Sequence, residues 1–264
     1  MIGRHYFRLV PAAVLLLSAA ALPAQESAKA TPRVQTKKYD FKDAKKEMEY
    51  GLFVPSKYDK AKPTPLIVAL HGLYSNPTQI LSYPGFTDLA EKNGYILAAP
   101  MGYNSKGWYG QTPPFGGKPD PENLYELSEQ DVMNVLEIVR KDYAIDPQRV
   151  YLMGHSMGGG GTIHLAIQHP DLWSALAPIA PAIFHPVRDL EKIKHIPIIL
   201  IQGDKDNLVR VAAVRPWAEK MKELKMTYMY DEVPGGDHIS VAIKELSKVF
   251  EFFNAHTKPA KKTD

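Results

Sequence analysis

The 264-residue chain contains no cysteine. This absence excludes disulfide bonds, thiolate metal sites, a cysteine nucleophile and a lipid-modified cysteine. A marked excess of one charge is also lacking, because 32 lysine and arginine residues face 29 aspartate and glutamate residues, for a formal net charge of +3. Such a near-neutral chain lacks the strong positive potential typical of nucleic-acid binding proteins, so we expect no nucleic-acid partner.

Long apolar runs are scarce, and the longest lies near the N-terminus. Arg4 and Arg8 precede an apolar run from Leu9 to Leu22, and Leu22-Pro23-Ala24 has the pattern of a signal-peptidase site. The run is about 14 residues long, shorter than the roughly 18 to 20 that a membrane span requires. We expect residues 1–24 to be a signal peptide cleaved near Ala24, and the mature protein to be secreted or periplasmic without membrane attachment. An uncleaved anchoring helix is the alternative.

The length of the chain favours one large α/β domain over two. Residues 25–36 are small and polar, which predicts a disordered spacer, and residues 257–264 predict a solvated tail. The domain itself is expected over residues 37–256. Nothing in the sequence indicates the oligomeric state.

From Leu66 onward, apolar strand segments alternate with helix-compatible segments. This alternation predicts a mainly parallel sheet, of the eight-stranded type, with helices on both faces and with ligands at the carboxyl ends of the strands. The expected strands cover 37–42, 47–54, 66–70, 95–99, 150–153, 175–180, 197–202 and 227–233. The expected helices cover 86–93, 128–143, 162–168, 189–194, 211–224 and 239–253. Ser128 and Asp131 have the spacing of a capping box for the second of these helices.

Two intervals between the expected elements bear on a binding site. Residues 103–127 form a long loop at the end of a strand, where sites usually lie, and this loop contains Trp108 and Tyr109. These two aromatic residues and Tyr74 are the candidates for substrate contact. The segment between Ala182 and Pro197 is too short for a large lid domain, which favours an open cleft.

The central motif is Gly154-His155-Ser156-Met157-Gly158, which matches G-x-S-x-G. An apolar strand segment precedes it and a helix-compatible segment follows it. This pattern is typical of a nucleophile elbow, in which a tight turn exposes the serine and leaves no room for side chains at the flanking glycines.

A serine nucleophile needs a base, and the base needs an orienting acid. Asp204 and Asp206 follow the strand expected at 197–202, and His238 follows the strand expected at 227–233. His238 combines a strand end with a glycine-rich loop, and the chain order serine, acid, histidine is the one that a nucleophile elbow implies. From the residues alone, both aspartates remain candidates for the acid.

The elbow, the loop that carries Asp204 and Asp206 (the acid loop) and Gly236-Asp237-His238 together resemble the α/β-hydrolase superfamily. They resemble most its small secreted serine esterases, of the polyhydroxyalkanoate depolymerase-like and feruloyl-esterase-like group. The resemblance implies the α/β-hydrolase fold. It also assigns the acid to Asp206, because the family's His-Gly-x-x-Asp-x-x-Val pattern aligns with Gly203 and Val209. Gln202 replaces the histidine of that pattern, which we expect to leave catalysis unaffected.

The same resemblance implies an oxyanion hole formed by the backbone N–H groups of Leu73 and Met157. No metal-ligand cluster or cofactor motif is present, because Gly160 stands where a phosphate loop needs lysine and Ile163 where a dinucleotide motif needs glycine.

The expected function is hydrolysis of carboxylic esters through an acyl-enzyme, with aryl, feruloyl, acetyl or polyester substrates. A prolyl-oligopeptidase-like peptidase and a non-catalytic binding protein on the same scaffold are the alternatives.

Overall fold

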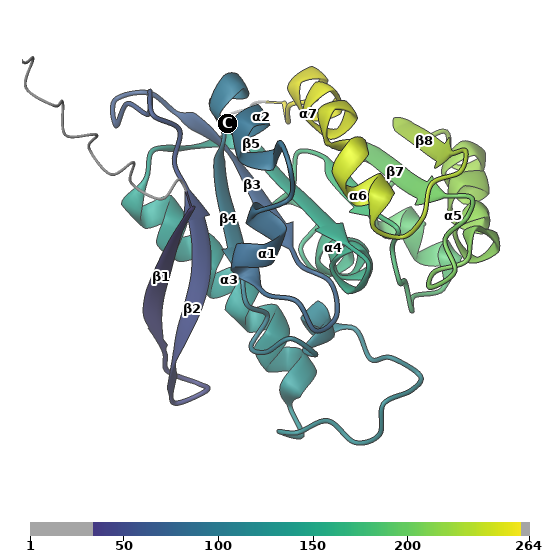
Figure 1. Cartoon of the computed structure of the whole chain (residues 1–264), viewed down its shortest axis with the longest axis horizontal. Helices are drawn as coiled ribbons and strands as arrows, with labels where there is room; N and C mark the ends of the chain where they lie inside the picture. The colour runs from purple at the N-terminus through teal and green to yellow at the C-terminus, as the bar shows by residue number, and fades with distance from the viewer. Residues whose placement is uncertain (1–33, 260–264) are drawn as a thin grey trace, which may run out of the picture. The chain divides into compact units, whose positions relative to one another are not determined.

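An eight-stranded sheet organises the part of the chain that this computed structural model describes, residues 34–259 (Figure 1). The expected signal peptide and most of the expected spacer lie outside the described residues. The strands are β1 Val34–Phe41, β2 Lys46–Phe53, β3 Thr64–Leu70, β4 Ile96–Pro100, β5 Ile145–His155, β6 Leu176–Ile179, β7 Ile198–Gly203 and β8 Tyr228–Val233. Their order is β1-β2-β4-β3-β5-β6-β7-β8, and all strands from β4 to β8 along the sheet pair in parallel. The mainly parallel sheet predicted from the sequence is confirmed.

Helices cover both faces of this sheet. On β3, Leu66 and Val68 belong to one buried cluster and Ile67 and Ala69 to the other, because successive side chains of a strand point to opposite faces. The first cluster also contains residues of α3 Leu124–Asp142, α4 Met157–Gln168 and α5 Val211–Glu223. The second contains residues of α1 Pro77–Leu81, α2 Phe86–Asn93, α6 Ser240–Lys244 and α7 Leu246–Ala255. Burial on both faces explains why the central strands are continuous apolar runs in the sequence.

Several expected boundaries differ from the structure. β1 begins at Val34, so the expected spacer does not extend to residue 36. The helix expected over 239–253 is divided into α6 and α7 at Glu245, and the short helix α1 was not predicted. Between β6 and β7 the chain forms only the short 3₁₀ helix η2 Val187–Ile193, in agreement with the absence of a large lid. None of the helices formed by residues 34–259 is long and apolar enough to cross a membrane.

The predicted capping box of α3 is wrong. The helix begins at Leu124, one turn before Ser128, so Ser128 and Asp131 lie inside it and are fully buried. The Ser128 hydroxyl accepts a hydrogen bond from the Tyr109 N–H at 3.0 Å, and the Asp131 carboxylate accepts one from the Gly102 N–H at 2.7 Å. These two side chains therefore hold the loop that follows β4 against the helix.

The solvated tail expected from residue 257 is also incorrect for Lys258. Its backbone N–H donates to the Gln148 carbonyl at 3.0 Å, and its ammonium donates to the carbonyl oxygens of Asp171 and Leu172, both at 2.9 Å. The end of the described chain is therefore fixed to the start of β5 and to the loop before β6.

The Asp131→Ala substitution is expected to destabilise the fold. The carboxylate also accepts hydrogen bonds from the Tyr39 hydroxyl and, at 3.4 Å, from the Tyr103 N–H, so its removal leaves several buried donors unpaired. Each such donor costs about 1 to 3 kcal/mol, and we expect a loss of roughly 2 to 4 kcal/mol in the free energy of unfolding, measured by urea denaturation. Glu137→Ala, at an exposed position of the same helix, is the control and should change stability by less than about 1 kcal/mol. Equal effects of the two substitutions would contradict this role of Asp131.

Candidate active site

Ser156 lies on the sharp turn between β5 and α4. Its backbone has φ 59° and ψ −114°, a left-handed conformation that costs a residue with a side chain about 1 to 3 kcal/mol. Its N–H donates to the Ile179 carbonyl at 2.9 Å, and its carbonyl accepts from the N–H groups of Gly160 and Ala182, both at 3.0 Å. The strained turn is therefore held by hydrogen bonds from both sides, which keeps the serine at the carboxyl end of the sheet.

The two glycines of the motif are required by close backbone contacts. A Cβ atom at Gly154 would lie 2.1 Å from the Gly158 oxygen, and a Cβ atom at Gly158 would lie 2.1 Å from the Leu70 oxygen. Atoms cannot approach this closely without displacing the backbone. The first turn of α4 thus packs directly against the ends of β5 and β3, as the elbow motif implied.

Asp206 and His238 meet at the same end of the sheet. Asp206 follows β7 and His238 follows β8, and the Oδ2 atom of the aspartate lies 2.7 Å from Nδ1 of the imidazole. The other carboxylate oxygen accepts from the N–H groups of Leu208 at 2.8 Å and Val209 at 2.9 Å. The carboxylate is completely buried, so its partners fix both its position and its orientation. This is the arrangement of an acid that orients a catalytic base.

The two candidate aspartates occupy different places. Asp204 accepts a hydrogen bond from the Gly235 N–H at 2.7 Å and so joins the loop after β7 to the loop after β8. Only Asp206 contacts the imidazole of His238. The geometry therefore favours Asp206, which the family pattern also indicated, over Asp204.

Gln202 contributes to the acid loop in a way that sequence reasoning missed. Its amide nitrogen donates to the Val209 carbonyl at 2.9 Å and lies 3.2 Å from Oδ2 of Asp206. Its amide oxygen is buried and has no hydrogen-bond partner among residues 34–259. The sequence offered one signal of this contact. Gln202 stands where the family pattern has histidine, and its amide can donate a hydrogen bond to the carboxylate of the acid.

The loop after β3 passes beside Ser156. A Cβ atom at Gly72 would lie 3.6 Å from the Cβ atom of Ser156. The next residue of this loop is Leu73, so its backbone begins close to the serine. Within residues 34–259, neither the Leu73 N–H nor the Met157 N–H donates to another group, whereas the Tyr74 N–H donates to the Ser105 carbonyl at 2.9 Å. Two free N–H groups on either side of a serine are what an oxyanion hole requires.

The side chain of His71 holds the loop after β3 in place. Its ring is fully buried and lies within 2.8 Å of the Gly72 carbonyl oxygen and 2.9 Å of the Met101 carbonyl oxygen. Burial lowers the pKa of His71, while the two facing carbonyl oxygens act in the opposite direction. The ring therefore connects the loop after β3 to the end of β4.

A cleft of about 470 Å³ adjoins the same loop. Leu73, Tyr74, Trp108 and Phe115 are among the residues that line it. The rings of Trp108, Phe115 and Phe184 pack against one another with centroids 5.1 to 5.7 Å apart, and Tyr74 is 70% exposed. Of the predicted site residues only Leu73, Tyr74 and Trp108 line this cleft, and Trp108 is itself only 6% exposed.

Tyr109 does not take part in this surface. Its side chain is 0% exposed, and its hydroxyl donates to the His71 carbonyl at 3.3 Å. The expectation that Tyr109 contacts substrate is therefore incorrect, because the 3₁₀ helix η1, Trp108–Gly110, turns the ring toward α4 and the core. An aromatic residue in a loop gives no signal in the sequence that distinguishes these two orientations.

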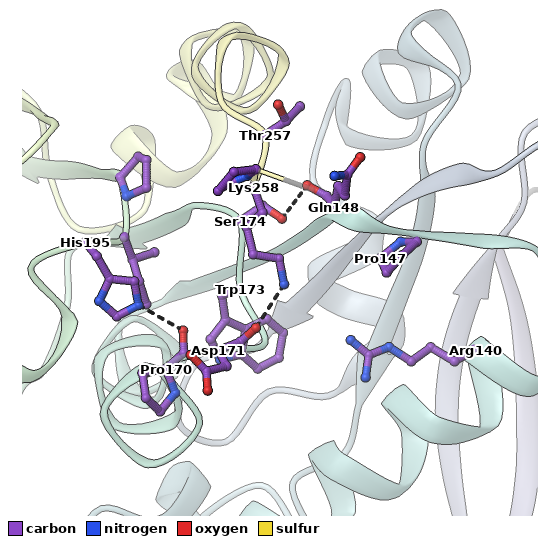
Figure 2. A pocket seen from close by; sticks show the side chains of 13 residues that line it. Arg140, Pro147, Gln148, Pro170, Asp171, Trp173, Ser174, His195, Thr257 and Lys258 are labelled. Atoms are coloured by element: carbon purple, nitrogen blue, oxygen red, sulfur yellow. Dashed lines mark hydrogen bonds between the residues drawn. The ribbon is translucent and has the colours of Figure 1, made fainter. Parts of the chain in front are cut away.

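A second cavity, of about 930 Å³, lies away from the predicted site, among residues at the start of β5 and residues that precede β6 and β7 (Figure 2). Arg140, Trp173 and His195 line it, and Lys258 extends along one side toward the carbonyl of Asp171. None of the predicted catalytic residues lines this cavity. Among the described residues, no group of three or more histidine or acidic side chains has the geometry to hold a metal ion.

Comparison with known proteins indicates the same class of chemistry. A family model described as "Putative esterase" matches residues 42–250. The chain is 28% identical over 151 residues to S-formylglutathione hydrolase of Rattus norvegicus, covering 53% of each protein. It is 27% identical over 186 residues to the bifunctional acetylxylan esterase/xylanase XynS20E of Neocallimastix patriciarum, covering 69% of this chain and 25% of the relative. The chain thus spans about half of the first relative and a quarter of the second.

The solved structures support the fold. A CE1 ferulic acid esterase of Anaeromyces mucronatus in complex with ferulic acid has a TM-score of 0.66 and 21% identity, covering 87% of this chain and 93% of that chain. An S-formylglutathione hydrolase of Staphylococcus aureus has the same TM-score and 17% identity, covering 83% and 95%. At this level of identity the likeness concerns the fold, and the predicted α/β-hydrolase fold is confirmed.

The Gly158→Ala substitution tests the steric account of the elbow. The added methyl group would collide with the Leu70 carbonyl, so we expect a loss of more than about 3 kcal/mol in the free energy of unfolding. Gly85→Ala is the control, because Gly85 has φ 82° but no atom within 4 Å of its Cβ position, and it should cost only about 1 kcal/mol. Urea denaturation of both variants measures the difference. A Gly158→Ala variant as stable as the control would refute the collision.

Proposed function

The chain belongs to the esterase family whose model spans residues 42–250, and we propose that it is a serine hydrolase that cleaves carboxylic esters through an acyl-enzyme. The observation that carries the proposal is the 2.7 Å contact between Asp206 and His238, at the same end of the sheet as the strained turn of Ser156. This combination of a serine on an elbow, a base at a strand end and a buried acid is the catalytic triad of esterases.

In the proposed reaction, the Ser156 hydroxyl attacks the ester carbonyl carbon while Nε2 of His238 accepts its proton. His238 then gives this proton to the leaving alcohol, and the acyl group remains on the serine oxygen. Water, activated by the same imidazole, hydrolyses the acyl-enzyme and regenerates the hydroxyl. Asp206 accepts the hydrogen of Nδ1, which keeps Nε2 directed toward the reacting oxygen and stabilises the imidazolium when it forms.

The negative charge that develops on the carbonyl oxygen is stabilised by the N–H groups of Leu73 and Met157. Their availability and the closeness of Gly72 to Ser156 support this role. The Met157 N–H also belongs to the first turn of α4, where the helix dipole favours negative charge. One donor of this kind contributes about 3 to 4 kcal/mol to transition-state stabilisation in a well-studied serine protease.

The aromatic cleft supports esters of aromatic acids as the substrate class. Trp108, Phe115 and Tyr74 line the same cleft as Leu73, one of the two proposed oxyanion donors. Flat aromatic groups bind such side chains by offset or edge-to-face stacking. The likeness to a ferulic acid esterase is consistent with this choice, and we name feruloyl-type esters over acetyl or polyester substrates.

We also propose that the mature protein is secreted or periplasmic. The support is the sequence pattern of residues 1–24, with Arg4 and Arg8 before an apolar run and a small-residue site at Ala24. Loss of these residues would leave 30 basic and 29 acidic residues, a net charge of +1. A near-neutral surface of this kind suits a neutral ester substrate better than a nucleic acid.

The Ser156→Ala substitution is expected to lower kcat for a p-nitrophenyl ester by at least about 10⁴-fold, because no other group forms the acyl-enzyme. The variant should keep the circular dichroism spectrum and melting temperature of the wild type. Ser82→Ala, which removes an exposed hydroxyl at the end of α1, is the control and should keep full activity. Ester turnover by the Ser156→Ala variant near the wild-type rate would reject the proposed function.

The Phe115→Ala substitution is expected to raise KM for methyl ferulate about fivefold and to leave hydrolysis of methyl acetate unchanged, because only the aromatic acyl group reaches this ring. Phe115 is 55% exposed, so its loss should not affect folding. Met229→Ala removes another exposed apolar side chain, on β8, and should change neither substrate. An equal effect on both esters would contradict the assignment of the aromatic cleft to the acyl group.

A further inference from the structure

His155 occupies the variable position of the G-x-S-x-G motif, directly before Ser156. The motif gives this position no role, yet the side chain is only 3% exposed and lies at the end of β5 among polar partners. Its imidazole stands beside the imidazole of His238, with ring centroids 4.8 Å apart. A buried histidine between the nucleophile and the base therefore needs an explanation.

Both ring nitrogens of His155 have a defined partner. Nε2 lies 2.8 Å from the backbone carbonyl oxygen of His238, and Nδ1 lies 2.8 Å from the hydroxyl of Tyr83. A carbonyl oxygen can only accept, so Nε2 carries the hydrogen and donates it to His238.

The protonation of the ring then follows. Burial, with the neighbouring His238 as a smaller cause, lowers the pKa of His155 to about 4, so the ring is neutral at pH 7. A neutral imidazole with its hydrogen on Nε2 has a lone pair on Nδ1, which accepts the hydrogen of the Tyr83 hydroxyl. Burial raises the pKa of Tyr83, so this hydroxyl keeps its hydrogen. Tyr83 therefore favours the one tautomer that can hold the carbonyl of His238.

This bond connects two parts of the sheet that are not neighbours. Ser156 follows β5 and His238 follows β8, and β6 and β7 lie between them in the sheet. With about 4.8 Å per strand, the two strands are roughly 14 Å apart, so loops must bring the base to the nucleophile. Asp206 orients the ring of His238 but is itself attached to β7. The His155 contact is a direct link from the strand of the nucleophile to the backbone of the base.

We propose that His155 is a positioning residue for the reaction: its Nε2 hydrogen holds the carbonyl of His238 so that the imidazole of His238 stays within reach of Ser156, and Tyr83 fixes the tautomer that does so. The inference rests on the proposed function of Ser156 and His238 in ester hydrolysis. A displacement of about 1 Å in a reacting group can lower a rate by about 100-fold, so one hydrogen bond at this place affects kcat.

Two substitutions of His155 test this role. The amide nitrogen of His155→Gln falls near the place of Nε2 and can still donate to the His238 carbonyl. The shorter His155→Asn places its amide near Nδ1, so it can accept from Tyr83 but cannot reach His238. Asparagine is one methylene shorter than glutamine, so a loss of packing alone would also affect His155→Asn more strongly. The melting temperatures of both variants and the Tyr83→Phe test separate a packing loss from the loss of the hydrogen bond.

The experiment measures kcat and KM for a p-nitrophenyl ester in both variants of the full chain, together with their melting temperatures. We expect kcat to fall less than about threefold in His155→Gln and more than about tenfold in His155→Asn, with KM within twofold of the wild type in both. An equal loss of kcat in the two variants, an unchanged kcat in His155→Asn, or an effect on KM alone would overturn the proposal.

Tyr83→Phe provides a second test that does not depend on whether the His155 variants fold. Loss of the hydroxyl should lower kcat about threefold, because the tautomer that donates to the His238 carbonyl is then no longer fixed. Tyr151→Phe is the matched control, because it removes a tyrosine hydroxyl that donates to the His256 carbonyl away from the predicted site. Equal kcat values for Tyr83→Phe and Tyr151→Phe would overturn the proposal.

The outcome also separates this inference from the proposed function. If the wild-type chain hydrolyses no ester, or if Ser156→Ala retains turnover, the proposed function fails. If the wild type is active and depends on Ser156, but kcat falls equally in His155→Gln and His155→Asn or is equal in Tyr83→Phe and Tyr151→Phe, only the positioning role fails.

Discussion

The site depends on one crowded contact, the packing of the first turn of α4 against the end of β3. Because Gly158 has no side chain, the helix can approach the Leu70 carbonyl closely, and Ser156 adopts its strained turn just before this contact. The loop after β3 lies beside the serine, and within residues 34–259 the N–H groups of Leu73 and Met157, our proposed oxyanion donors, have no hydrogen-bond partner. In our account, this tight backbone approach places both the proposed nucleophile and the proposed oxyanion donors.

The parallel sheet supplies the remaining groups, since the carboxyl ends of β5, β7 and β8 lie at one edge. Asp206 and His238 meet there through loops, and buried hydrogen bonds fix each of them. In our account, His155 joins the base to the strand of the nucleophile. The site is thus a set of loops whose mutual positions depend on a few buried polar contacts, whereas the apolar layers determine only the sheet that carries them.

The sequence predicted all eight strands. The central ones, such as β3 and β7, appear as continuous apolar runs because they are buried on both faces, whereas β1 and β2 near the sheet edge contain exposed charged residues. The sequence also predicted that Ser156, Asp206 and His238 follow strand ends, since glycine-containing turns flank all three. It could not predict that α3 begins one turn earlier, at Leu124, that Asp131 holds the preceding loop, or that Tyr109 turns inward. The last two arrangements depend on hydrogen bonds between distant segments, which no local pattern encodes. The same reason explains why His155 gave no signal.

The central claim is that Ser156 is a nucleophile activated by His238 and Asp206. Mass spectrometry of the intact chain after treatment with a fluorophosphonate, followed by peptide mapping, tests it most directly. The account predicts a single adduct on Ser156, formed much more slowly when Asp206 is replaced by alanine. The absence of an adduct, or an adduct on another residue, would contradict it.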